Sequence, residues 1–272
     1  MKPAPFDYLR AGTAAEALET LHQCGGDARI LAGGQSLLPM LNMRLARPGV
    51  VIDIMHVPEW QRIETTETTL RIGAGVRQIA LERHPGLRQP LLTAALGWVG
   101  HAQTRSRGTV CGSVAHADPS AELPLVLVAL KGTIHLRSRR RRRDVAAADF
   151  FTGMMATTRT DEEMIEAVSI PTARPGTGTA FREIARRHGD FAIVACAAVA
   201  DATTVRLTVA GVADRPTAID LPAAPATRDD ALDTFAWSLD ARDDLHATAR
   251  YRRELVRQIG RSVMQEALQC RA

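Results

Sequence analysis

The sequence predicts an α+β protein with two parts, and three observations predict this class. The 272 residues are 46% hydrophobic and 24% charged, which is typical of a folded soluble chain of one large or two medium domains. Short apolar segments beside glycine turns alternate with segments of helical periodicity up to Pro171. Proline and glycine then cluster at residues 174–178, and segments typical of an antiparallel strand meander follow.

The first 54 residues predict two strands and two helical segments. Thr13 is the expected N-cap of the first helix, with Glu16 at the capping-box position and Gly25 just beyond its end. The expected elements are, in order, a helix at 13–24, a strand at 28–32, a glycine turn followed by a helical segment through Leu45, and a strand at 50–54.

The middle of the chain predicts further strands and helices. Asp118 followed by Pro119 is typical of an N-cap and a first helical residue, which predicts a helix through Leu130. The other expected elements are a strand at 69–73, helices at 76–83 and 90–100, a hairpin that begins with a strand at 133–137 and has residues 139–143 at its tip, and a strand at 164–170.

Beyond the break at residues 174–178 the pattern changes. Residues 191–201 and 204–212 predict strands of an antiparallel meander, and the chain from Arg228 to its end predicts helix with an acidic start. No internal repeat is present.

The net charge of +4 comes from one local cluster. The chain has 34 Lys and Arg residues and 30 acidic residues, and five of the basic residues are the arginines at 139–143. Without these five, the chain would have 29 basic and 30 acidic residues. This run is most simply a solvated turn, and a contact with a partner or a polyanion is the alternative. A nucleic-acid-binding module that uses these arginines is therefore a remote function.

Cysteine spacing and hydropathy limit the other function classes. The four cysteines lie far apart without a CxxC pair, so we expect no metal site and no disulfide framework. The N-terminus has no apolar leader, and no apolar run approaches the ~20 residues that span a bilayer. We therefore expect a cytoplasmic protein without a transmembrane segment.

Two glycine-bearing turns are candidates for binding a diphosphate, because each follows a strand-like segment and precedes a helix-like one. In the first, Gly33 and Gly34 leave space for backbone N–H groups to surround phosphate oxygens, and Ser36 adds a hydroxyl donor. Neither the GxGxxG nor the Walker spacing is present. Taken alone, this segment is more simply an ordinary tight turn.

The second turn begins at Thr109 and contains Gly112 and Ser113. Its hydroxyls are candidates for the other wall of the same cleft, and the carboxylates of Asp118 and Glu122 are candidates to accept hydrogen bonds from sugar or ribityl hydroxyls. Capping of a helix is the alternative role of Asp118. A Ser–His–Asp triad is disfavoured because no GxSxG elbow surrounds Ser113, and we expect no catalytic side chain in this chain.

Three segments resemble the FAD-binding medium subunit of molybdenum hydroxylases, of the carbon monoxide dehydrogenase type in the xanthine dehydrogenase family. They are residues 32–39, 107–119 and 181–194, and the resemblance covers essentially the whole chain. It implies a two-part FAD-binding domain, related to vanillyl-alcohol oxidase, at residues 1–175 with subdomains 1–55 and 56–175. A smaller C-terminal domain of a three-stranded antiparallel sheet with helices is implied at 176–272.

The resemblance also implies the residues that contact FAD. The diphosphate lies between the two turns, Asp118 and Glu122 lie near the ribityl and phosphate region, and Ile165 touches the flavin ring. The implied cofactor-binding residues are Leu31, Ala32, Gly33, Gly34, Gln35, Ser36, Leu37, Thr109, Gly112, Ser113, Asp118, Glu122 and Ile165.

Two positions depart from the family pattern. Cys111 replaces a common glycine, which disfavours a positive φ and implies a thiol close to the cofactor. Arg182 and Glu183 stand where relatives often carry a lysine near the flavin.

The implied function is electron transfer by FAD within a larger complex. A large subunit binds the molybdenum–pterin cofactor and oxidises the substrate, a small subunit carries two [2Fe–2S] clusters, and this chain passes the electrons on, in a dimer of heterotrimers. The alternative within the same superfamily is a self-sufficient FAD-dependent reductase.

Overall fold

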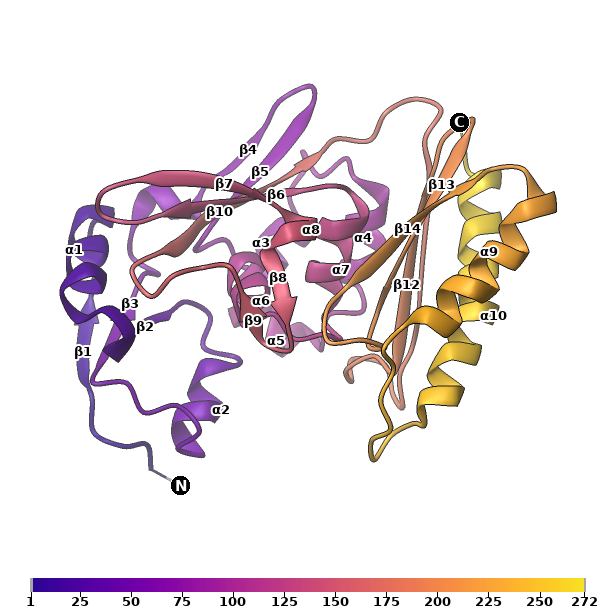
Figure 1. Ribbon diagram of the computed structural model, residues 1–272. Helices are drawn as coiled ribbons and strands as arrows, with labels where there is room; N and C mark the ends of the chain where they lie inside the picture. The colour runs from indigo at the N-terminus through magenta and orange to yellow at the C-terminus, as the bar shows by residue number, and fades with distance from the viewer. Residues whose placement is uncertain (1, 272) are drawn as a thin grey trace.

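The computed structural model describes residues 2–271, without the side chains of residues 225–227. A three-stranded parallel sheet of β1 (Asp7–Arg10), β3 (Val50–Asp53) and β2 (Ala28–Leu31) forms the N-terminal part, with β3 in the centre. Helix α1 (Ala14–Cys24) packs on this sheet, and the short helix α2 (Leu37–Asn42) projects below it (Figure 1). The predicted cap is confirmed, because Thr13 Oγ1 accepts a hydrogen bond from the Glu16 N–H at 3.2 Å.

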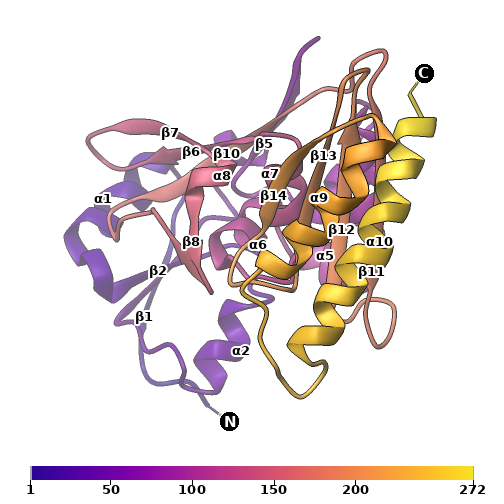
Figure 2. The same cartoon turned by 45° about the vertical axis from the view of Figure 1, so that its right-hand side comes forward.

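A five-stranded antiparallel sheet forms the middle of the molecule. Its order is β4 (Ile63–Thr65), β5 (Thr69–Gly73), β10 (Met164–Pro171), β6 (Thr133–Arg137) and β7 (Arg142–Ala146). The helices of this part are α3 (Gln78–Glu82), α4 (Pro90–Leu96), α5 (Ala102–Arg107), α6 (Val110–His116), α7 (Glu122–Ala129) and α8 (Ala147–Phe150). Every residue of α7 is buried, because this helix lies between the middle sheet and the C-terminal sheet (Figures 1 and 2).

The smaller elements complete the first part of the chain. Residues 2–271 contain two 3₁₀ turns, η1 (Gly25–Asp27) and η2 (Pro58–Gln61). A short hairpin consists of β8 (Phe151–Gly153) and β9 (Ala156–Thr157).

Three predictions about the middle segment were wrong in detail. Helix α7 begins at Glu122 and not after Asp118, because Asp118 Oδ1 accepts a hydrogen bond from the Ser120 N–H at 2.8 Å and forms a turn instead. The segment after Thr109 is helix α6 and not a turn. Arg142 and Arg143 belong to strand β7 and not to the hairpin tip.

The C-terminal part is an antiparallel sheet covered by two helices. The strands are β11 (Gly178–Ile184), β12 (Val194–Ala200), β13 (Thr204–Ala210) and β14 (Thr217–Pro222), in that order. The sheet thus has four strands where three were expected, because residues 178–184 pair with β12. One face packs on α4 and α7, and the other on α9 (Pro225–Ser238) and α10 (Ala249–Gln269) (Figure 2).

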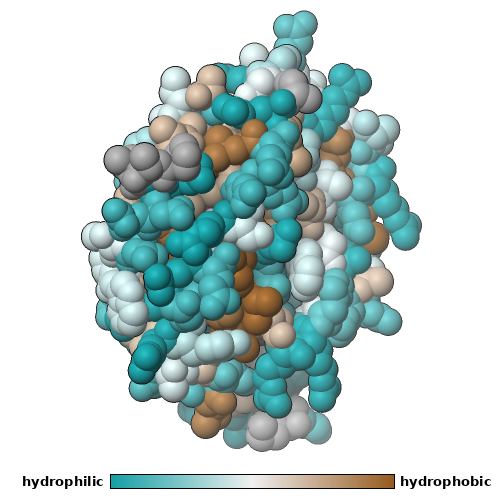
Figure 3. Space-filling view, turned by 90° about the vertical axis from the view of Figure 1, so that its right-hand side faces the viewer, coloured by the Kyte–Doolittle hydropathy of each residue, from teal (hydrophilic) through white to brown (hydrophobic). Residues whose placement is uncertain are grey.

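The helical face of the C-terminal part is mainly hydrophilic, with hydrophobic atoms in small separate areas (Figure 3). None of the helices in the described part of the chain is long and apolar enough to cross a bilayer. Strands β10 and β11 are connected by residues 172–177, the proline- and glycine-rich segment at which the domain boundary is predicted.

Candidate flavin-binding site

At Gly33 the first predicted diphosphate-binding turn touches the two residues that directly precede the second predicted segment. A Cβ atom at this position would lie 2.3 Å from the carbonyl oxygen of Arg107 and 2.6 Å from the Cα of Gly108. These distances are too short for any side chain, so the segments approach this closely only because residue 33 is glycine. The structure therefore brings the turn after β2 and the turn before α6 to the same place.

The first turn presents several backbone donors without acceptors. Among the described residues, none accepts a hydrogen bond from the N–H groups of the five consecutive residues 33–37. Gly34 adopts a left-handed conformation with φ of +72°, which favours glycine and reverses the chain before α2. Free N–H groups that converge at such a turn suit the negative charge of a phosphate or diphosphate.

The second turn is the short connection between α5 and α6 at residues 108–109, and hydrogen bonds join it to the segment before α3. Thr109 Oγ1 accepts a hydrogen bond from the Gly112 N–H at 3.1 Å and so caps α6. The N–H of Gln78 donates to the carbonyl oxygen of Gly108 at 2.8 Å, and the N–H of Val110 donates to that of Val76 at 3.1 Å. The sequence analysis missed Gln78, which is buried and has an Oε1 atom without a hydrogen-bond partner.

Asp118 and Glu122 follow α6 in the chain. Asp118 is half-buried and its Oδ1 is engaged in the turn with Ser120. Glu122 is 5% exposed at the start of α7, and burial raises the pKa of its carboxyl group to about 7, with a further increase from the charge of Asp118. At neutral pH this carboxyl group is therefore partly protonated.

Ile165 and Cys111 lie in the hydrophobic core. Ile165 pairs with Leu136 in the middle sheet beside a bulge and is 4% exposed. The thiol of Cys111 lies 3.6 Å from the carbonyl oxygen of Ile72 in β5, and burial raises its pKa to about 12. Cys111 has an ordinary helical φ, so its replacement of the family glycine causes no strain, and the thiol contacts strand β5.

The arginine run is exposed at residues 139–142, as a solvated turn would be, but four of its five side chains also form ion pairs. Arg143 donates to both carboxylate oxygens of Glu163, at 2.7 and 2.8 Å, and holds the pKa of this carboxyl group at about 2. Arg142 pairs with Glu166 at 3.2 Å. Further pairs join Arg139 to Glu19 at 2.6 Å and Arg141 to Glu163 at 3.4 Å.

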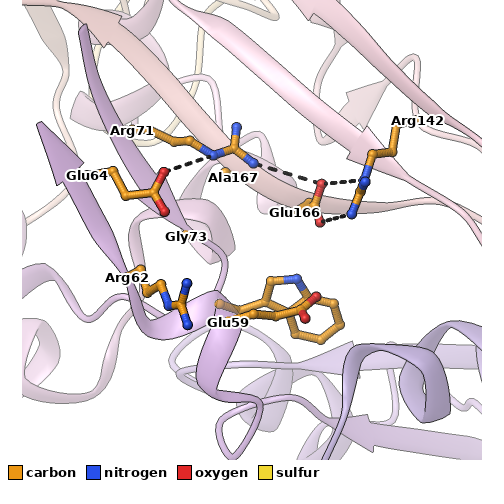
Figure 4. Close-up of a pocket in the computed structure, with 9 residues that line it drawn as sticks. Glu59, Arg62, Glu64, Arg71, Gly73, Arg142, Glu166 and Ala167 are labelled. Atoms are coloured by element: carbon orange, nitrogen blue, oxygen red, sulfur yellow. Dashed lines mark hydrogen bonds and ion pairs between the residues drawn. The ribbon is translucent and has the colours of Figure 1, made fainter. Parts of the chain in front are cut away.

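Glu166 and Arg142 also line a pocket of about 230 Å³ on the outer face of the middle sheet (Figure 4). Figure 4 shows acidic and basic side chains of β4, β5, β7 and β10 in alternation around it. Among the described residues, three arginines and three glutamates line this pocket, so their formal charges sum to zero.

No triad or metal cluster accompanies the two turns. The side chains of Ser113, His116 and Asp118 form no hydrogen bonds with one another among the described residues. Over residues 2–271, no group of three or more His, Cys, Asp or Glu side chains is arranged to hold a metal ion.

Comparison with known protein families identifies the family to which this chain belongs. Residues 4–173 match the model of the FAD-binding domain in molybdopterin dehydrogenase, and residues 179–267 match that of the CO dehydrogenase flavoprotein C-terminal domain. The chain belongs to this molybdopterin dehydrogenase flavoprotein family. The free N–H groups at residues 33–37 fit the FAD diphosphate that such a domain binds.

Relatives of this flavoprotein family cover nearly the whole chain. The chain is 38% identical to the nicotine 6-hydroxylase medium subunit of Paenarthrobacter nicotinovorans, over 98% of this chain and 99% of the relative. It is 35% identical to subunit alpha of the 6-hydroxypseudooxynicotine dehydrogenase complex of the same organism, over 98% and 96%. A solved structure of carbon monoxide dehydrogenase from Hydrogenophaga pseudoflava matches with a TM-score of 0.90 and 31% identity, over 100% of both chains.

Proposed function

We propose that this chain is the FAD-carrying electron-transfer subunit of a molybdenum hydroxylase complex. A small partner subunit with [2Fe–2S] clusters supplies the electrons, and a large partner subunit binds the molybdenum–pterin cofactor and oxidises the substrate. The contact between the two turns at Gly33, together with the free N–H groups that follow it, is the observation that carries this proposal. Bound FAD would accept electrons from the clusters and release them to an external acceptor.

The residues of this chain bind and orient the cofactor and exclude water from it. The turn at Leu31, Ala32, Gly33, Gly34, Gln35, Ser36 and Leu37 supplies N–H donors to the diphosphate. Thr109, Gly112 and Ser113, at the start of α6, are proposed to form the opposite wall. Asp118 and Glu122 are proposed to contact the ribityl region, and Ile165 the flavin ring, from the sheet below.

The relatives support a function within a complex, because their names describe a medium subunit and a complex subunit. We propose a dimer of heterotrimers in the cytoplasm. The proposed domain limits in this chain are residues 1–175 and 176–272, with subdomains at 1–55 and 56–175.

The substrate chemistry is proposed to reside in the large subunit. A relative named for nicotine matches 98% of this chain in sequence, and a solved structure named for carbon monoxide matches 100% of it, although nicotine and carbon monoxide differ greatly in size and polarity.

Two other functions are less well supported. A self-sufficient reductase does not agree with the subunit names of the relatives. A nucleic-acid-binding module would require free cationic groups in the arginine run, and four of its five guanidinium groups have carboxylate partners.

The experiment is purification of the native assembly by an affinity tag on this chain. The expected result is a yellow complex of three polypeptides with one FAD per copy of this chain, as measured by intact-mass analysis, flavin absorbance and metal analysis. A colourless protein after reconstitution with excess FAD would refute the cofactor assignment, and a chain that oxidises substrate without partners would refute the subunit assignment.

A further inference from the structure

Three polar side chains on the outer face of the middle sheet form a Ser–His–Asp hydrogen-bond chain. The Nδ1 atom of His135 lies 2.7 Å from Asp144 Oδ1, and its Nε2 atom lies 2.7 Å from Ser169 Oγ. The three residues come from strands β6, β7 and β10, so no GxSxG segment joins them in the sequence. None of them belongs to the two turns of the proposed cofactor site.

The register of the sheet places these side chains together. Asp144 is directly opposite His135 in the pairing of β6 with β7. On the other side of β6, Ala167 is opposite His135, and Ser169 lies two residues further along β10 and so on the same face. The chain neighbours of His135 on both sides are buried in the core. Backbone pairing of three strands, and not a flexible loop, therefore holds the three groups in contact.

The hydrogen bonds determine where the proton of the neutral imidazole ring lies. A carboxylate only accepts hydrogen bonds, so Nδ1 carries the ring proton and donates it to Asp144. Nε2 then has the lone pair and accepts the hydrogen bond of the Ser169 hydroxyl group. In this arrangement a histidine removes the proton of a serine that attacks a carbonyl carbon, while the carboxylate maintains the required tautomer.

The hydroxyl group is accessible to small molecules. Ser169 is half-buried, and the side chains of His135 and Asp144 are 18% and 65% exposed. The pocket of about 230 Å³ in Figure 4 includes Ala167 in its lining. Two residues span about 7 Å along a strand, so this end of the pocket adjoins Ser169. A small acyl group in the pocket would therefore present its carbonyl carbon to the hydroxyl group.

A cation faces the hydroxyl group from the neighbouring strand β5. Arg71 is directly opposite Ser169 and also lines the pocket. Its ion pairs are long, because the paired oxygens of Glu64 and Glu166 both lie 3.9 Å from its guanidinium group (Figure 4). This separation is beyond hydrogen-bond range. Among the described residues, its guanidinium N–H groups are thus left for a carbonyl oxygen on which negative charge develops.

We propose that Ser169 is the nucleophile of an esterase site for esters of small carboxylic acids, with His135 as general base and Asp144 as the residue that positions it. This inference does not depend on the binding of FAD. Ser169 Oγ bonds to the ester carbonyl carbon as its proton moves to His135 Nε2, and the ester C–O bond breaks so that the alcohol leaves with that proton. Water then attacks the acyl group and gives a proton to His135, which returns it to Ser169 as the acid leaves.

The test is reaction of the full-length chain with 4-nitrophenyl acetate, followed by 4-nitrophenolate absorbance and by peptide mass mapping. The expected result is a rapid burst of one 4-nitrophenolate per chain, with an acetyl group on Ser169. Ser169→Ala should lose the burst. Asp144→Asn should lower the rate constant of the burst at saturating ester by about tenfold or more, without a change in the half-saturating concentration. The control is Thr133→Ala, which removes the hydroxyl group opposite Ser169 on β6; both ring nitrogens of His135 have other partners, so the burst should stay within twofold of wild type.

Two results would overturn the esterase site. One is a wild-type chain without a burst or without acetyl on Ser169, and the other is a burst that persists in Ser169→Ala or is as fast in Asp144→Asn. If Ser169→Ala does not fold, a fluorophosphonate replaces it, which forms a serine O–P bond with loss of fluoride. The wild type must then carry this adduct on Ser169 and lose the burst, and an unmodified Ser169 overturns the assignment. Flavin absorbance is measured separately, so a failure to bind FAD would refute only the proposed electron-transfer function.

Discussion

Replacement of Gly33 by alanine tests whether contact between the two turns is required for FAD binding. The residue does not have a positive φ, so alanine meets no backbone strain at this position. Its only direct consequence is the new methyl group, which would lie 2.3 Å from the carbonyl oxygen of Arg107. The effect of Gly33→Ala therefore measures the separation of the two turns and no other property.

The expected magnitude follows from that distance. A Cβ atom closer than 3.0 Å to a neighbour is essentially never observed, so the turns must separate by at least 0.7 Å, the difference between 3.0 and 2.3 Å. A hydrogen bond of about 2.9 Å from one turn to the diphosphate then lengthens beyond the range of about 2.7–3.2 Å. Two lost hydrogen bonds to a charged group, at about 1.5 kcal/mol each, correspond to about 100-fold weaker binding.

The assay is titration of the apoprotein with FAD, followed by flavin fluorescence and by calorimetry. Gly97→Ala is the matched control, because a Cβ atom there would lie 3.6 Å from its nearest neighbour, which is an ordinary contact. We expect FAD affinity to fall about 100-fold in Gly33→Ala and to stay within twofold of wild type in Gly97→Ala. Wild-type affinity in a folded Gly33→Ala variant would show that the diphosphate does not bind between these turns.

Three further predictions concern ionisable groups. Glu163→Gln should lower the free energy of unfolding at pH 7 by about 3 kcal/mol, because it leaves Arg143 without its buried partner. Since the pKa of Glu163 is lowered from 4.5 to about 2, the difference from wild type should be complete above pH 4.5 and disappear as the pH falls toward 2, which guanidinium unfolding at several pH values will show. Arg252→Met should cost about 2–4 kcal/mol, because one Nη atom donates to two backbone carbonyl oxygens at 2.6 Å; an unchanged melting temperature would contradict this. At pH 8 a thiol reagent should modify the exposed Cys270 quickly but reach Cys111, whose pKa burial raises to about 12, only after unfolding; rapid modification of both in the native protein would refute this assignment.

Local signals predicted those elements whose ends depend on nearby residues. The prediction of Thr13 as the N-cap was correct because the Thr13 hydroxyl group accepts from the N–H of Glu16, only three residues further along the chain. The start of α7 was wrong for a related reason, because Asp118 has two local uses and the turn with Ser120 prevailed over capping. Strand β11 was missed because Arg182 and Glu183 interrupt its apolar alternation, although its partner β12 is the next strand in the chain.

Contacts between distant segments could not be predicted from the residues alone. Arginines in the run are ion-paired to Glu163, just before β10, and to Glu166 on β10, both about 20 residues away, so these pairs could not be predicted from the run itself. The burial of Glu183 has the same origin, because only packing of the two parts against each other removes this side chain from water. The glycines and hydroxyls of the two turns were candidates from their own pattern, the resemblance added the remaining cofactor-binding residues, and no pattern in the sequence pointed to Gln78.

The position of Gly33 also determines how cofactor binding should affect the rest of the molecule. The parallel and the antiparallel sheet of the flavin-binding part share no strand, so no ladder of hydrogen bonds holds one sheet to the other. One turn extends from β2 of the parallel sheet, and the other lies between helices that pack beside the antiparallel sheet. A diphosphate bound between these turns would therefore contact segments beside both sheets at once and would stabilise their arrangement as well as each turn. Loss of the contact at Gly33 should thus weaken FAD binding and the cooperativity of unfolding together, whereas a change within one turn alone should weaken only the first.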